Sequence, residues 1–96
     1  MKITVVSSAA RCVTFSAEPP VAAAQGARIV RELAERGVIV ISDETYMQFV
    51  YDGDHWSAAS VPDWRRNVVV IGTFSKSFAM MGWRVGFMLA DRAVSE

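Results

Sequence analysis

The fold is decided by residues 68–77, which read VVVIGTFSKS. The first four residues are apolar and β-branched, which is typical of a strand buried inside a sheet. Gly72 then opens a polar segment in which Lys76 lies between two serines. Open α/β sheets bind ligands beyond the carboxyl ends of such strands. The stretch therefore predicts a lysine at a ligand-binding edge.

A second apolar run, VIVI at residues 38–41, has the same character and predicts a strand buried on both faces. It ends in the polar sequence SDETY at residues 42–46. If the two strands are parallel neighbours, their carboxyl ends meet at one edge of the sheet. Asp43 and Lys76 would then face the same crevice.

Residues 21–36 have helical spacing, with an apolar stripe on one side and charged side chains on the other. Glu32 and Arg36 are spaced as a favourable ion pair on the outer side. Gly37 follows as the residue that ends the helix in a left-handed conformation. The segment predicts an amphipathic helix packed on a sheet.

Three further strands are predicted with less defined patterns. Residues 3–6 and 13–15 suggest a short strand pair, and residues 84–90 suggest a strand after the lysine segment. The link at residues 76–83 is too short for a right-handed crossover, so that last strand should either be antiparallel to its neighbours or lie elsewhere in the sheet. The fold class is α/β, with a partial, mostly parallel sheet and flanking helices.

The composition limits the classes of function. The chain has 96 residues, 52% of them hydrophobic, which suits one piece of a larger core. Its formal net charge is zero and no basic stripe is present, which argues against nucleic-acid binding. One cysteine, one histidine and no long apolar run argue against a disulfide framework, a metal site and a membrane span. We expect a cytoplasmic protein.

The polar groups around Lys76 indicate a particular chemistry. An amine near the carboxylate of Asp43, with hydroxyls and Arg84 beside it, is what a phosphorylated aldehyde cofactor requires. Other enzyme classes fit less well. A P-loop needs glycine directly before the lysine, where this chain has Ser75, and His55 has no nucleophile signature near it.

Three blocks of this chain resemble class I/II pyridoxal-phosphate-dependent aminotransferases, which have the aspartate aminotransferase fold (fold type I). They are ISDETY at 41–46, FVYDG at 49–53 and FSKSFAMMGWRVG at 74–86. The resemblance covers about residues 28–92. It implies that residues 28–96 are part of the family's large domain, whereas residues 1–27 are left unassigned.

The resemblance implies pyridoxal 5'-phosphate as cofactor and roles for individual residues. Lys76 would condense with the aldehyde and then carry the proton between the substrate's α carbon and the cofactor. Asp43 would pair with the ring nitrogen, and Tyr46 would donate a hydrogen bond to the phenolic oxygen. Phosphate ligands would be Ser75, Arg84 and a further hydroxyl, Thr73.

Other segments depart from the family. No asparagine precedes Asp43, since Asn67 is the only one in the chain, and residues 18–21 read EPPV where the family has Asn-Pro-Thr-Gly. The phosphate loop, the aromatic residue that stacks on the ring and the small domain are also missing. We therefore expect amino transfer between an amino acid and a 2-oxo acid in a homodimeric family, and no activity from these residues alone.

Two alternatives stay open. The chain could be a non-catalytic remnant that needs a complementary chain, or part of a lyase, decarboxylase or synthase of the same fold type. Each site residue also has a structural reading. Lys76 could be a solvated loop residue, Asp43 the cap of a short helix at 44–50, and Arg84 a surface charge stacked on Trp83. Glu44 and His55 are assigned structural or loop roles.

Overall fold

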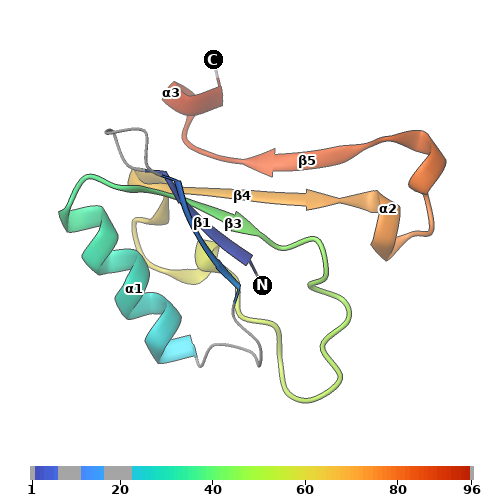
Figure 1. The fold of residues 1–96 in the computed structure, drawn as a ribbon, viewed down its shortest axis with the longest axis horizontal. Helices are drawn as coiled ribbons and strands as arrows, with labels where there is room; N and C mark the ends of the chain where they lie inside the picture. Colours follow the sequence, from blue (N-terminus) through green and yellow to red (C-terminus); the bar gives the residue numbers. More distant parts are fainter. Residues whose placement is uncertain (1, 7–11, 17–22, 96) are drawn as a thin grey trace.

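The computed structural model describes the backbone of residues 2–6 and 12–16 and all of residues 23–95 except where stated. Five strands form one sheet in the order β2-β1-β3-β4-β5 (Figure 1). Their bounds are Lys2–Val6 (β1), Cys12–Ser16 (β2), Ile39–Asp43 (β3), Val68–Thr73 (β4) and Gly86–Leu89 (β5). Together with the helix α1, these strands confirm the predicted α/β class.

The sheet is mixed rather than mostly parallel. β3 and β4 form a parallel pair, as predicted for the two apolar runs. The pairs β1–β2, β1–β3 and β4–β5 are antiparallel. Of the two placements predicted for the last strand, the structure has the antiparallel one, with β5 paired to β4 after the short link. The strand pair expected near the N-terminus is present as β1 and β2.

The helix α1 spans Ala23–Glu35, within the predicted range, whose first two residues lie outside the described ones. Gly37 ends it with φ 67°, in the left-handed region that glycine adopts at little cost. The N–H of Gly37 donates to Ala34 O at 3.0 Å, and the N–H of Val38 donates to Leu33 O at 2.9 Å. This double hydrogen bond is a Schellman motif, and it turns the chain directly into β3.

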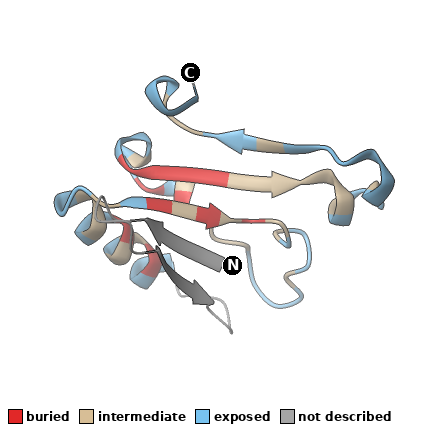
Figure 2. Cartoon of the chain, turned by 45° about the horizontal axis from the view of Figure 1, so that its top comes forward, coloured by how far each residue is buried: buried red, intermediate tan, exposed pale blue. Residues whose placement is uncertain are grey.

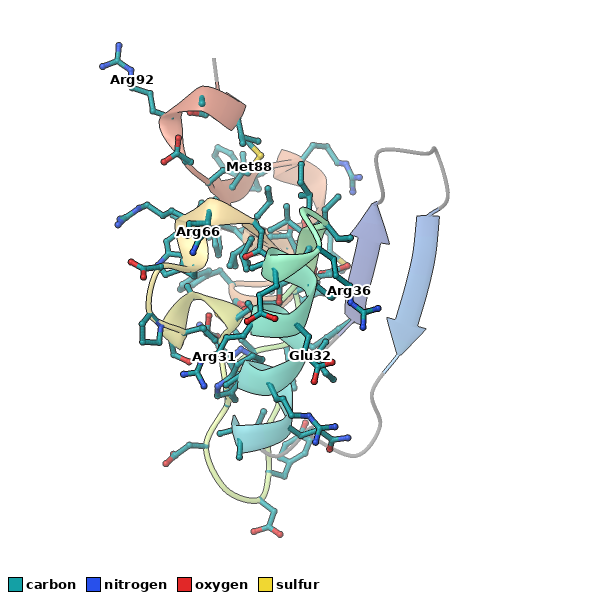
Figure 3. The ribbon with its side chains drawn as sticks, turned by 90° about the vertical axis from the view of Figure 1, so that its left-hand side faces the viewer. Arg31, Glu32, Arg36, Arg66, Met88 and Arg92 are labelled. Carbon is teal, nitrogen blue, oxygen red and sulfur yellow. The ribbon has the colours of Figure 1, made fainter. Side chains whose placement is uncertain are left out.

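The outer side of α1 is charged. Arg31, Glu32 and Arg36 extend from the helix, and all three are exposed (Figure 3). The predicted pair of Glu32 with Arg36 is not formed. Instead, Glu32 Oε1 lies 3.6 Å from Nε of Arg28, one turn earlier in the helix. Both side chains are well exposed, so the pair contributes little to stability.

The core lies between α1 and one face of the β3–β4 pair. Val40 of β3 and Val68 and Val70 of β4 are buried there against Val30 of α1 (Figure 2). Alternation along a strand places the neighbouring residues on the opposite face. On that opposite face Ile39 of β3 is 43% exposed, although Val69 of β4 is buried at 7%. Val40, on the face toward α1, is 0% exposed. The prediction that residues 38–41 are buried on both faces is therefore wrong, because α1 covers only one face.

The segment between β3 and β4 returns to this core. Trp56 packs on Gly26 of α1 so closely that a Cβ at Gly26 would lie 2.6 Å from the indole ring.

Short helices complete the described chain: η1 (Ala58–Ser60), η2 (Trp64–Arg66), α2 (Phe74–Ser77), η3 (Met81–Trp83) and α3 (Arg92–Ser95). Over the described residues, each helix is too short or too polar to cross a membrane.

Candidate functional site

The parallel pairing of β3 and β4 brings the predicted site residues to one edge of the sheet. Asp43, the last residue of β3, lies opposite Ile71 in the register. β4 continues for two more residues to Thr73, and α2 with Lys76 follows directly. Asp43 is out of phase with the buried Val40, so its side chain belongs to the face that α1 leaves open.

One carboxylate oxygen of Asp43 is held by the turn that follows. Asp43 Oδ1 accepts hydrogen bonds from the Thr45 N–H at 3.1 Å and from Thr45 Oγ1 at 2.5 Å. Residues 45–48 form turns instead of the short helix that Asp43 was expected to cap. Within the described residues, Oδ2 accepts no hydrogen bond, so this oxygen can take a proton donor. The backbone of Lys2 in β1 pairs with Asp43.

Thr73 organises the start of the lysine helix. Its Oγ1 accepts a hydrogen bond from the Ser75 N–H at 3.1 Å, which caps α2. The same hydroxyl donates to Val85 O at 3.2 Å. Thr73 is therefore already engaged in the structure on both its donor and acceptor sides. The capped turn presents Lys76 with an exposed side chain.

Arg84 is held close to the same turn by backbone contacts. It follows η3 with φ 53°, a left-handed conformation that is unfavourable for a residue with a side chain. The carbonyl of the next residue, Val85, accepts from Phe74 N at 3.2 Å and from Thr73 Oγ1. The cation–π contact of the described chain is made by Arg65 over Trp64, and Arg84 does not take part in it.

Tyr46 belongs to the turn that follows β3. It is 60% exposed, and its ring packs edge-on against Phe49 with 6.2 Å between the centroids. The Phe49 N–H donates to Tyr46 O at 2.9 Å, so both belong to one local turn. Among the described residues, no hydrogen bond or ring contact joins Tyr46 to Lys76. The structure thus brings Asp43, Thr73 and Arg84 to one edge and leaves the Tyr46 ring in solvent.

Two polar side chains near the candidate site, those of Ser77 and Glu44, are buried. The hydroxyl of Ser77 is buried and has no hydrogen-bond partner among the described residues. The carboxylate of Glu44 is buried at 4% exposure and accepts four hydrogen bonds. The sequence places the Ser77 hydroxyl near Lys76, but the burial of Ser77 and of Glu44 depends on residues elsewhere in the chain and cannot be found from local pattern.

The arrangement combines groups of different charge at one sheet edge. Lys76 and Arg84 supply positive charge, Ser75 and Ser77 supply hydroxyls, and Asp43 supplies a carboxylate with one oxygen available. Such a set can bind an anion at one end and a protonated ring nitrogen at the other. These are the requirements of a phosphorylated pyridine cofactor.

Comparison with known proteins identifies the family. The model of the family described as aminotransferase class I and II matches residues 21–96. The chain belongs to this family. The matched region contains α1, β3, β4, α2 and β5, and so it includes every residue of the candidate site.

Individual class I and II aminotransferases are similar over the same region. An aspartate aminotransferase of Sulfurisphaera tokodaii is 43% identical over 60 residues, which are 62% of this chain and 15% of that protein. An aspartate aminotransferase of Pyrococcus abyssi is 44% identical over 63 residues, which are 65% of this chain and 16% of that protein. The chain thus spans only a small part of the length of these aminotransferases.

A solved structure of this family confirms the fold. The aromatic aminotransferase from Pyrococcus horikoshii superposes with a TM-score of 0.67 and 40% sequence identity, over 73% of this chain and 19% of that one. The region that superposes therefore has the fold of a fold type I aminotransferase, as the sequence blocks implied.

Proposed function

We propose that this chain provides the cofactor-binding strand ends of an aminotransferase. The reaction would move an amino group between an amino acid and a 2-oxo acid, with pyridoxal 5'-phosphate as cofactor. The observation that carries the proposal is the parallel β3–β4 register, which sets Asp43 beside the strand that leads into Lys76. The aminotransferase relatives favour this reaction over a lyase, decarboxylase or synthase.

Pyridoxal phosphate, when bound, supplies an electrophilic aldehyde and a ring that withdraws electrons from a bond at the substrate's α carbon. The groups present fit it. The side chain of Lys76 is exposed and so can reach an aldehyde. The buried hydroxyl of Ser77 lacks a partner, and one oxygen of Asp43 is available for a ring N–H.

Lys76 is the proposed catalytic residue. Its Nζ would hold the cofactor through the aldehyde and, once the substrate's amine has displaced it, would be the base at the substrate's α carbon. The N-cap by Thr73 fixes the backbone of the turn that carries it. Because α2 is only one turn long, this cap is important for the direction in which Lys76 extends.

Asp43 and Tyr46 are the proposed ligands of the ring. Asp43 Oδ2 would accept the ring N–H and keep the proton on that nitrogen, since a nearby carboxylate favours the charged form. The hydrogen bonds from Thr45 to Oδ1 orient the carboxylate for this contact. Tyr46 would donate its phenolic hydrogen to an oxygen of the ring.

Ser75, Thr73 and Arg84 are the proposed ligands of the phosphate. Arg84 can donate two parallel N–H bonds to phosphate oxygens. The hydroxyl of Ser75 is one residue from Lys76 and on the same turn. Thr73 would have to release Val85 O to donate to phosphate, so its main role in this proposal is to cap the turn.

The test is covalent labelling of the purified chain. Incubation with pyridoxal phosphate followed by borohydride reduction should attach the cofactor to Lys76, as read by peptide mass spectrometry. Lys76→Ala should lose this label. The chain has one other lysine, Lys2, whose backbone is paired with Asp43, so Lys2→Arg is the matched control and should keep the label. Equal labelling of both lysines would contradict the proposal.

A second candidate is that the chain acts only together with a complementary chain. Large apolar side chains are exposed beside the candidate site, among them Trp83 at 73%. Monomeric proteins rarely leave such surfaces uncovered. The chain would then bind cofactor weakly alone and gain affinity with the partner. Co-expression with the genes on either side of its own, followed by a pull-down, distinguishes the two candidates.

A further inference from the structure

The loop between β3 and η1 is closed at its neck by one buried side chain. Glu44 directly follows Asp43, and residues 55–58 form the far end of the loop. Glu44 Oε1 accepts from Ser57 Oγ at 2.9 Å and from the Ala58 N–H at 3.0 Å. Glu44 Oε2 lies 2.9 Å from His55 Nε2. Compact surface loops whose ends are joined in this way keep a defined shape.

The near end of the loop is tied to the same carboxylate. Ser42 Oγ donates to Glu44 Oε1 at 3.1 Å, and Ser42 is fully buried in β3. The Glu44 N–H donates to Ile71 O at 2.9 Å, which extends the β3–β4 ladder by one residue. We call this set, Ser42, Glu44, His55, Ser57 and Ala58, the Glu44 clamp.

A buried carboxylate is costly unless its hydrogen-bonding capacity is used. Four donors to one side chain meet that condition and hold the two ends of the loop together. The proposed ring ligands lie on either side of this point in the chain. Asp43 precedes Glu44, and Tyr46 follows it by two residues, in the turn where the Met47 N–H donates to Glu44 O at 3.1 Å.

We propose that Glu44 is a positioning residue, which through the Glu44 clamp holds the backbone of Asp43 and Tyr46 in place, so that their side chains can meet the ring of the cofactor. The assignment of ring contacts to these two residues rests on the proposed function. The clamp itself is a property of the chain without cofactor. Functional groups need such support, because a site whose neighbours are loose loses its geometry.

The test uses His55, because it contributes one contact and is partly exposed, so its variants should fold. His55→Ala removes the contact with Glu44 Oε2. His55→Gln restores a donor at similar reach. Amide hydrogen exchange of residues 45–54, measured without cofactor, should be about tenfold faster in His55→Ala and close to wild type in His55→Gln, the factor expected for one hydrogen bond to a charged group.

The second readout is the cofactor. Wild type and His55→Gln should bind pyridoxal phosphate with the same visible absorption band, whereas His55→Ala should bind about tenfold more weakly with a shifted band. Asn67→Ala is the structural control. Asn67 is buried and donates to Val30 O and Val38 O, outside the loop, so its loss should lower stability without changing exchange of residues 45–54.

The outcomes separate the two proposals. Absence of cofactor binding by the wild-type chain overturns the proposed function, and the exchange data still decide whether the clamp holds the loop. Binding by wild type together with unchanged exchange in His55→Ala overturns the clamp. Faster exchange with unchanged affinity and absorption band shows that the clamp only stabilises the loop, and overturns the positioning role.

Discussion

At the scale of single residues, the candidate site has a strained backbone conformation at Arg84, the residue proposed to bind the phosphate. Arg84 is one of three described non-glycine residues with positive φ, together with Asp63 and Ala79. A left-handed conformation costs a residue with a Cβ about 1–2 kcal/mol. Such strain often marks functional positions, where the surrounding structure maintains it. Stability and anion binding should therefore respond in opposite directions to a change here.

Arg84→Gly tests that opposition. Glycine adopts φ 53° readily, so the free energy of unfolding should stay unchanged or rise by up to about 1 kcal/mol, as measured by urea denaturation. Affinity for pyridoxal phosphate should fall about ten- to a hundredfold, because a charge-assisted contact with phosphate is lost. Arg84→Lys, which keeps the charge and the strain, is the control. A large loss of stability in Arg84→Gly would contradict the account.

At the scale of elements, the β4–β5 pair depends on close backbone approach. Gly86 pairs with Thr73 in the register, and a Cβ at Gly86 would lie 2.7 Å from Gly72 O. Phe87 covers Gly72 from the neighbouring position and packs on Phe74 at 5.8 Å between centroids. The pairing of β4 with β5 therefore places the backbone of Arg84 and Val85 next to the start of α2.

Gly86→Ala should open this pair. The contact is with a backbone oxygen, which cannot move without breaking the ladder, so we expect a loss of about 1–3 kcal/mol in the free energy of unfolding. Gly82→Ala is a matched control, since a Cβ there meets nothing within 4 Å. It should be neutral or slightly stabilising. Equal effects of both substitutions in thermal denaturation would argue against a close approach at Gly86.

At the scale of the whole molecule, the sheet has one covered face and one partly open face. α1 and the η1 segment bury one side of β3 and β4 (Figure 2). On the other side Ile39 is 43% exposed, whereas Val69 is buried. β5 lies at an edge of the sheet, with Met88 51% exposed. Exposed apolar side chains on an edge strand favour association with other chains.

We therefore expect the chain to self-associate at micromolar concentration. Met88→Glu should shift the sedimentation coefficient toward that of a monomer, because it places a charge on the edge strand without disturbing a buried contact. Gln25→Glu adds the same charge on the exposed side of α1 and should leave association unchanged. A wild-type chain that sediments as a monomer at micromolar concentration would show that the exposed apolar side chains of β5 do not drive association.

Much of the site's position follows from local sequence. The two β-branched runs, Gly37 and the short link before β5 predict their elements through periodicity and turn chemistry, and the structure confirms them. The placement of Asp43 and Lys76 at the same edge follows from the parallel pair. The roles assigned to these two residues remain predictions, because they depend on a cofactor and on tests of individual residues.

Other properties were decided only by the tertiary structure. β1 inserts between β2 and β3 and makes the sheet mixed, and α1 covers a single face, which leaves Ile39 open. Glu44 looks like an ordinary loop acid in the sequence, yet residues 55–58 surround its carboxylate. Periodicity and turn residues act over a few positions and so determine elements from sequence alone. Burial and strand order depend on segments far apart in the chain, which meet only when the fold is complete.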